Sequence, residues 1–182
     1  MGLSQSLTIY KDRLGVLIGR EGSVKKRLEE KLKVKLTIDS KTGQIEVEDV
    51  GGDVAKFMSA VEVIKAIGLG FSPQRAEKLL QEDYSLYVID LTEAFKDEKD
   101  IVRVKGRIIG EGGKTRRLIE ETTGVDISIY RDYVSMIGRF EDLLIAKEAI
   151  EMLLKGRPHK AVYSFLFEER RRRKLDRMRM WE

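Results

Sequence analysis

The chain has 182 residues, a length that suits one domain or two small ones. It contains no cysteine, which excludes disulfides and thiolate metal sites, and 36% of its residues are charged, well above the roughly 25% of an average globular protein. No apolar stretch has the length of a membrane span, and the start of the chain lacks the apolar core of a signal peptide. We therefore expect a cytoplasmic protein.

The net charge of +4 is unevenly distributed along the chain. Residues 155–182 hold ten Lys or Arg and four Asp or Glu, whereas the first 154 residues hold 25 basic and 27 acidic groups. Positive charge must therefore act locally, in clusters at residues 25–27, 114–117 and 170–174. The high charge content by itself fits either a thermophilic source or a polyelectrolyte partner.

The first half of the chain shows the order strand, helix, helix, strand, strand, helix. The expected elements are a short strand at 7–9, a helix at 13–18, a helix at 23–31, strands at 34–38 and from 45, and a long helix that ends near residues 68–70. The spacing of Val54, Phe57, Val61 and Ile64 places them on the buried face of that last helix. Ser72 and Pro73 form a typical helix start, so we expect a connector helix that reaches about residue 81.

The second half repeats this order. The expected elements are a strand at 86–91, a polar connection at 92–100, helical turns before Gly110, a helix at 114–122, strands at 125–130 and 134–137, and a helix at 141–154. A strand at 101–104 is the alternative for the first element, but it would leave no room for a helix before Gly110.

Two short glycine motifs mark the repeat. Residues 16–22 read VLIGREG and residues 107–113 read RIIGEGG, with Gly19 and Gly110 91 positions apart. In both halves a basic cluster, a leucine and a Glu-Glu pair follow the motif, and an alternating apolar run starts fifteen residues after the first glycine. Glycines occur in turns everywhere, so one motif would carry little information. Two motifs with matched flanks indicate a duplicated unit.

The chemistry of a Gly-x-x-Gly turn between two helices suits a nucleic-acid strand. A side-chain-free corner at a helix N-terminus lets phosphate oxygens approach free N–H groups. The next helical turn supplies basic side chains, and an apolar groove between that helix and the following strand can hold unstacked bases.

Both halves resemble the K-homology (KH) domain family of the βααββα type, over about residues 7–67 and 86–154. Its signature, Ile-Gly-x-x-Gly, stands at residues 18–22 and 109–113. The resemblance implies an α+β fold with two type I KH domains packed together, plus a connector helix and a C-terminal basic helix. The variable pair of such loops is often basic, whereas Glu21 and Glu111 are acidic here and should repel phosphate.

A narrower resemblance links the chain to the archaeal small-subunit rRNA-processing KH proteins, relatives of the eukaryotic partner-of-Nob family. It rests on the tandem units, on GLGFSPQRAEKLL, on VKGRIIGEGGKTRRLIEE and on GRPH at residues 156–159. The resemblance implies binding of the 3′ end region of small-subunit rRNA, a role in its maturation, and contact with assembly or initiation factors. We expect a monomer with domains at 1–70 and 85–155, a connector at 71–84 and a basic tail at 156–182.

The expected RNA-binding residues fall into three groups. The loops contribute backbone and flanking groups, basic side chains neutralise phosphates, and apolar side chains line the base grooves. They are Ile18, Gly19, Arg20, Glu21, Gly22, Lys25 and Lys26 in the first unit and Arg107, Ile109, Gly110, Glu111, Gly112, Gly113, Lys114, Arg116, Arg117, Val125 and Ile127 in the second. If only one unit grips RNA, we favour the second.

Other features have simpler interpretations. His159 is the only histidine and has no second ligand nearby in sequence, so we expect a structural role and no metal or other cofactor. Glu46, Glu48, Asp49 and Asp53 are expected on a solvated edge, which argues against a metal-dependent nuclease. The basic tail could contact RNA, hold an acidic partner or be a solvated helix. Its aromatic residues Tyr163, Phe165 and Phe167 are expected in the core.

We therefore expect a non-enzymatic protein that binds single-stranded RNA. An interaction scaffold, in which the KH units contact proteins and RNA contacts are secondary, is the alternative.

Overall fold

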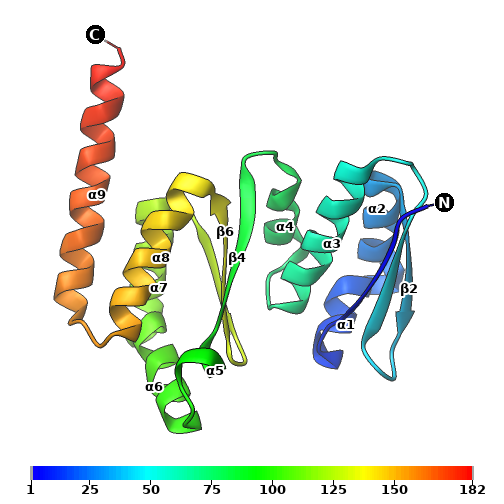
Figure 1. The fold of residues 1–182 in the computed structure, drawn as a ribbon, viewed down its shortest axis with the longest axis horizontal. Coiled ribbons are helices and arrows are strands. Elements are labelled where there is room, and N and C mark those ends of the chain that lie inside the picture. Colours follow the sequence, from blue (N-terminus) through cyan, green and yellow to red (C-terminus); the bar gives the residue numbers. More distant parts are fainter. Residues whose placement is uncertain (1, 182) are drawn as a thin grey trace. The chain divides into compact units, whose positions relative to one another are not determined.

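The computed structural model describes residues 2–181, and the chain divides after Leu86 into two compact units. Each unit contains a three-stranded sheet with helices on one of its faces (Figure 1). The mixed α and β architecture with two such sheets is the fold class expected from the sequence. Among the described residues, no helix combines the length and apolar character that a membrane span requires.

The first unit has the element order expected from the sequence. Its elements are β1 (Ser4–Thr8), α1 (Lys11–Ile18), the 3₁₀ turn η1 (Arg20–Gly22), α2 (Ser23–Leu32), β2 (Val34–Asp39), β3 (Gln44–Asp49), α3 (Val54–Gly68), α4 (Pro73–Ala76) and the 3₁₀ turn η2 (Glu77–Leu80). The sheet order is β1-β3-β2, and both pairs are antiparallel.

Alternation along β2 decides which face of this sheet is buried. Val34 and Leu36 point into the core, whereas the alternate residues Lys35 and Thr37 are exposed. The helices supply the other side of the core through Leu17, Leu28 and Ile64, all of which are fully buried. Burial of each such side chain contributes about 1.5–3 kcal/mol relative to exposure. The turn between α1 and α2, which contains the first glycine motif, therefore lies at the edge of a packed core.

The second unit repeats this plan and adds a long C-terminal helix. Its elements are β4 (Tyr84–Asp90), which begins before the division of the chain, α5 (Leu91–Ala94), α6 (Glu98–Ile109), the 3₁₀ turn η3 (Glu111–Gly113), α7 (Lys114–Thr123), β5 (Asp126–Tyr130), β6 (Tyr133–Arg139), α8 (Phe140–Leu154) and α9 (His159–Arg179). The sheet order is β4-β6-β5. Ile108, Ile119 and Ile150 belong to one buried cluster, which also contains Val162 and Leu166 of α9.

Several sequence expectations for the first unit need correction. The first strand begins at Ser4, three residues earlier than expected. Val54 is 60% exposed, because it occupies the first turn of α3, beyond the edge of the core that Phe57 and Ile64 fill. The connector splits into α4 and a 3₁₀ turn at residue 77.

The second unit also differs from its expected pattern. The polar connection at 92–100 contains α5 and the first turn of α6, whose start is capped by the Asp97 carboxylate. Residues 101–104 are helical, so the alternative strand there is wrong. The C-terminal helix begins at His159. Tyr163 and Phe165 are half-buried, but Phe167 is 52% exposed, so its expected place in the core is wrong.

Candidate nucleic-acid interface

The first glycine of each motif adopts a backbone conformation that other residues avoid. Gly19 has φ 73° and ψ 175°, and Gly110 has φ 74° and ψ 171°. A Cβ atom at Gly110 would lie 2.7 Å from the Thr115 Cβ and 2.8 Å from the Thr115 main-chain nitrogen. At Gly19 it would lie 2.8 Å from the Val24 nitrogen. Glycine is required at both positions, because the incoming and outgoing helices meet there without space for a side chain.

The last glycine of each motif directly precedes the following helix and has left-handed backbone angles. Gly22 and Gly113 have φ 75° and 77°, and neither α2 nor α7 has a side-chain cap at its start. The first N–H groups of such a helix have no intrahelical acceptor, and the helix dipole favours an anion there. Each loop therefore presents bare main chain at a helix mouth, which suits phosphate oxygens.

The two loops differ at their third position. Gly112 has φ 60° in the second unit, and the matching residue of the first unit, Glu21, has φ 53°. A non-glycine residue in this region costs roughly 1–2 kcal/mol of strain. Glu21 therefore adds strain to the first loop that the second loop avoids with Gly112. Each loop carries one carboxylate, Glu21 in the first and Glu111 in the second.

A depression of about 430 Å³ lies beside the second loop. Its walls come from α6, from the loop, from the first turn of α7 and from the first two turns of α9, which contribute His159 and Tyr163. The Tyr163 hydroxyl lies 2.8 Å from Oγ1 of Thr115, and Lys114 Nζ lies 5.6 Å from the centre of the Tyr163 ring. The C-terminal helix is thus part of this site, a feature that the sequence reasoning did not identify.

Arg107, which we expected to contact phosphate, has a structural role here. Its guanidinium donates to the main-chain oxygen of Leu153 at 3.3 Å and to that of Arg157. It therefore binds the end of α8 and the turn before α9 while it also lines the depression. His159 Nε2 lies 2.9 Å from the Arg107 carbonyl oxygen, a contact in keeping with a structural histidine.

The basic residues that follow the second loop differ in their freedom. Arg117 is exposed and has no ion pair among residues 2–181, and Lys114 is exposed beside the Tyr163 ring. Arg116 is half-buried, with Nε 3.9 Å from Glu120 Oε2. The structure therefore leaves Lys114 and Arg117 as the more accessible cations.

One carboxylate contact occurs in both units and was missed from the sequence. The Leu36 N–H donates to Glu29 Oε1 at 2.9 Å, and the Ile127 N–H donates to Glu120 Oε1 at 2.9 Å. Each contact joins the helix after the loop to the edge strand that follows it. The Glu-Glu pair repeated in the sequence was the available signal. The first glutamate of each pair fixes the helix against the strand.

The basic residues after the first loop are partly engaged elsewhere. Arg27 and Lys31 pair with Glu77 of the connector, at 2.9 Å and 3.8 Å. Lys26 and Arg20 are exposed, and Lys25 is half-buried. The first loop therefore has fewer free cations close to it than the cluster at residues 25–27 suggests.

The apolar residues expected to line the base grooves are not equivalent. Ile109 is 37% exposed and Ile18 is half-buried, so both are accessible at the loops. Val125 and Ile127 are each 1% exposed and belong to the core of the second unit. Their side chains therefore cannot line an open groove, because the alternation of the strand points them inward.

The acidic residues near the end of β3 have separate local contacts. Ser4 donates to Glu46 at 3.3 Å, Glu48 lies 3.8 Å from Lys35, and the Asp53 carboxylate accepts from the Lys56 N–H at the start of α3. Within the described part of the chain, no group of three His, Cys, Asp or Glu side chains is arranged to hold a metal ion.

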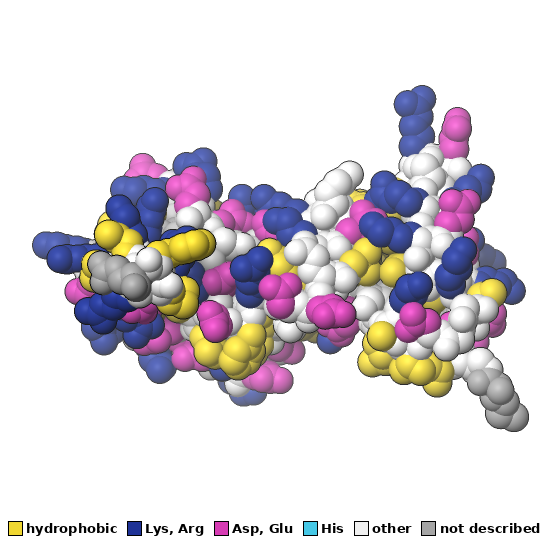
Figure 2. Space-filling view, turned by 90° about the horizontal axis from the view of Figure 1, so that it is seen from above, with side chains coloured by type: hydrophobic (Ala, Val, Ile, Leu, Met, Phe, Trp, Pro, Cys, Tyr) yellow, Lys and Arg dark blue, Asp and Glu magenta, His cyan; other side chains and the backbone are white. Residues whose placement is uncertain are grey.

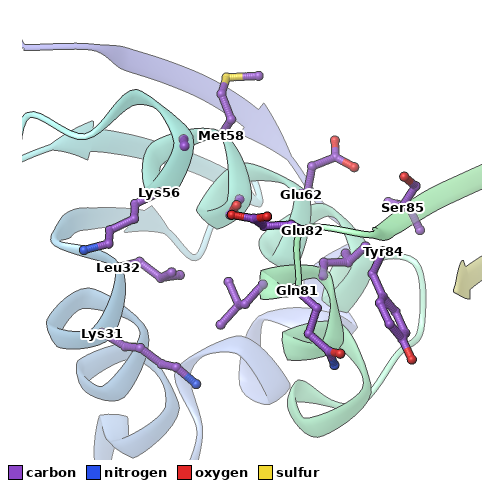
Figure 3. Close-up of a pocket in the computed structure, with 14 residues that line it drawn as sticks. Lys31, Leu32, Lys56, Met58, Glu62, Gln81, Glu82, Tyr84 and Ser85 are labelled. Atoms are coloured by element: carbon purple, nitrogen blue, oxygen red, sulfur yellow. The ribbon is translucent and has the colours of Figure 1, made fainter. Parts of the chain in front are cut away.

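A second hollow lies in the first unit, away from its glycine loop. It has a volume of about 750 Å³ and is lined by residues of α2, α3 and the segment 79–86. Figure 3 shows Lys31, Leu32 and Lys56 along one side and Gln81 and Tyr84 along the other. Its lining mixes apolar and charged side chains.

Comparison with known proteins agrees with this geometry. Residues 85–171 match the model of the eukaryotic-type KH domain (KH-domain type I) of PNO1, second copy. A KH domain-containing protein of Methanocaldococcus jannaschii is 45% identical over 177 residues, which cover 97% of this chain and 78% of that protein. The pre-rRNA-processing protein pno1 of Aspergillus fumigatus is 32% identical over 140 residues, and the match covers 75% of this chain and 55% of the fungal protein.

A solved structure extends the likeness to three dimensions. A chain in the crystal structure of the a/eIF2alpha–aDim2p–rRNA complex from Pyrococcus horikoshii is 40% identical and has a TM-score of 0.88. The similarity covers 94% of this chain and 96% of that chain. The chain belongs to the PNO1/Dim2p family of KH-domain proteins.

Proposed function

We propose that this protein binds single-stranded RNA through its glycine loops, and through the second loop most strongly. The observation that carries the proposal is the bare left-handed corner at residues 110–113, with an uncapped helix start behind it and the exposed Lys114 and Arg117 beside it. KH domains clamp about four backbone nucleotides with a loop of this kind. We propose that the first loop, where the strained Glu21 stands at the position of Gly112, is the weaker site.

The RNA proposed is the 3′ end region of small-subunit rRNA, and the role is assistance in its maturation. Support comes from the relatives: the fungal protein is named for pre-rRNA processing, and the Pyrococcus protein was crystallised with rRNA. We propose that the protein acts without catalysis, as a monomer in the cytoplasm. Labelled RNA incubated with it and Mg²⁺ should remain intact, and light scattering should give the mass of one chain.

The test is a binding titration with a fluorescent RNA that carries the 3′-terminal sequence of archaeal small-subunit rRNA. The variant Gly112→Asp/Gly113→Asp places two carboxylates where phosphate is proposed to lie. A Cβ atom at either position meets nothing within 4 Å, so the substitution causes no clash. We expect affinity to fall at least about 10-fold, because like charges oppose each other at this distance.

The matched control is Gly112→Asn/Gly113→Asn. Asparagine tolerates the left-handed region at least as well as aspartate and has nearly the same shape, so only the charge differs. The control should keep affinity within a few-fold of the original chain, and both variants should keep the same melting temperature. Equal affinity of the Asp and Asn variants would reject the phosphate site at this loop.

Protein contact is a second candidate function, favoured by the mixed apolar and charged hollow of the first unit. The Pyrococcus protein was crystallised together with a/eIF2alpha, and we propose an initiation-factor subunit as the partner class. The exposed Met58 at its edge offers a test. Met58→Glu should weaken capture of purified archaeal initiation factor 2 α subunit and leave RNA affinity unchanged. Unchanged capture would reject this surface.

A further inference from the structure

The C-terminal helix α9 begins beside the glycine loop of the second unit and ends in a basic segment. We call this segment, from residue 170 to the end of the helix, the arm. The first turns of α9 pack through Val162 and Leu166, and its middle is held by the ion pair of Arg173 with Asp142 of α8. Figure 1 shows the last turns of α9 extending past the ends of α7 and α8. The helix is therefore anchored beside the loop, and the arm projects from it.

The positive charges on this arm are mostly uncompensated. Arg172 pairs with Glu169, and Arg173 with Asp142. The other basic residues from 170 onward have no ion pair within the described residues: Arg170, Arg171, Lys174, Arg177 and Arg179. Figure 2, which looks onto the end of α9, shows Lys and Arg side chains around it. Like charges three or four residues apart destabilise a helix, and a polyanion would relieve that repulsion.

One face of α9 connects the loop to these charges. At 100° per residue, His159, Arg170, Lys174 and Arg177 all lie within about 40° of Tyr163 around the helix axis. His159 and Tyr163 line the depression beside the glycine loop. The face that borders the loop at the start of the helix is thus the face that carries three basic side chains further along.

Aromatic side chains lie on the same face. Phe167, between Tyr163 and Arg170, is 52% exposed, and Trp181, just after the last turn, is 90% exposed. Phe167 falls within about 40° of Tyr163 on the same helical count, and Trp181 follows the end of that face. Aromatic rings next to basic groups can hold single-stranded nucleic acid, with bases stacked on the rings and phosphates beside the cations.

We propose that the RNA strand held at the second glycine loop continues along this face of α9, which we call the α9 track (Tyr163, Phe167, Arg170, Lys174, Arg177 and Trp181). The proposal rests on the proposed RNA binding. The track is about 27 Å long at 1.5 Å per residue, so it would add several nucleotides to the four that the loop clamps. Its contacts reach phosphates and base faces, so it reads no sequence.

The test compares two RNA lengths. One is a short 3′-end rRNA fragment of about 6 nucleotides, and the other extends it at both ends to about 14 nucleotides. The original chain should bind the long RNA more tightly. The variant Arg170→Gln/Lys174→Gln/Arg177→Gln should lose this advantage, by about 10- to 100-fold at 0.1 M salt, and its salt slope should fall by about 2, because three single-strand phosphate contacts are removed. Its affinity for the short RNA should not change.

The control variant Lys65→Gln/Lys96→Gln/Lys99→Gln removes the same total charge from other exposed positions. It should keep the length advantage. Glutamine keeps helix propensity at the five helical positions, and Lys96 lies in the connection between α5 and α6, so both proteins should fold alike. Trp181 is the only tryptophan, so its fluorescence should change with the long RNA and stay constant with the short one.

An unchanged length advantage in the track variant would overturn the proposal and leave this face to an acidic protein. Equal losses for short and long RNA would also overturn it, because a track acts only on the extension. Failure of the original chain to bind even the short RNA would refute the proposed RNA binding itself. This outcome is distinct from failure of the track, because the short RNA does not reach the arm.

Discussion

The glycine loop of the second unit offers a direct comparison between two kinds of constraint on a glycine. At Gly113 only the left-handed backbone matters, because a Cβ atom there meets nothing within 4 Å. At Gly110 the backbone lies in a region populated almost only by glycine, and a Cβ atom would also lie 2.8 Å from the Thr115 main-chain nitrogen. We predict that Gly110→Ala is much more destabilising than Gly113→Ala.

The magnitudes follow from these constraints. Gly113→Ala should cost about 1 kcal/mol, the strain of a left-handed alanine. Gly110→Ala should cost about 3–4 kcal/mol. Backbone strain accounts for about 1–3 kcal/mol, and the new Cβ atom adds a further cost because it must push away the first residues of α7. That displacement also disturbs the hydrogen bond of Thr115 with Tyr163, worth roughly 1 kcal/mol.

Thermal unfolding followed by circular dichroism measures both effects. For a unit of about 100 residues each kcal/mol lowers the melting temperature by roughly 4–8 °C, so we expect losses of about 5 °C for Gly113→Ala and 15 °C or more for Gly110→Ala. If the two units unfold in separate steps, only the transition of the second unit should move. Equal losses for the two variants would refute the close approach at Gly110.

Three further predictions concern single side chains. Glu21→Gly places in the first loop the residue type that Gly112 has in the second. It should change the free energy of unfolding by less than about 1 kcal/mol, because relief of strain is offset by the greater entropy of the unfolded chain. It should also raise RNA affinity in a titration, and lower affinity would contradict the repulsive role of this carboxylate. Arg107→Gln should cost about 2 kcal/mol in urea unfolding, because it removes two hydrogen bonds to main-chain oxygens; a loss of RNA affinity without loss of stability would contradict its structural role. The Lys41 N–H donates to the Asp39 carboxylate at 2.9 Å and lowers the pKa of that carboxyl. The ionised Asp39 therefore stabilises the folded protein fully above the ordinary pKa of an aspartate, and this stabilisation is lost as the pH falls through the lower pKa of the folded state. Asp39→Ala should flatten the acid side of the stability profile, and an unchanged profile would contradict this.

The duplicated unit could be predicted from the sequence because its signals are local. Gly19 and Gly110 mark the two loops, and the alternation after each of them predicts the edge strand. The matched Glu-Glu pairs carry a contact that repeats at 2.9 Å in both units. The backbone geometry at both glycines confirms that the two motifs form the same local structure.

The remaining parts of the site depend on contacts that a sequence pattern does not contain. Arg107 is basic and next to the loop, but its direction is set by carbonyl oxygens 46 and 50 residues later. Val125 and Ile127 are apolar in a strand, and only the packed core decides that both point inward. The helical periodicity of the tail was visible, yet its docking beside the loop through Tyr163 depends on a hydrogen bond across 48 residues.

The central claim is that the corner at residues 110–113 holds the RNA backbone, and amide chemical shifts test it most directly. On addition of the short 3′-end rRNA fragment to the ¹⁵N-labelled protein, the largest shifts should fall on the N–H groups of Gly112, Gly113 and Lys114. The Gly112→Asp/Gly113→Asp variant should show no such shifts in α7. Shifts confined to residues 159–181, with the loop amides unmoved, would contradict the account.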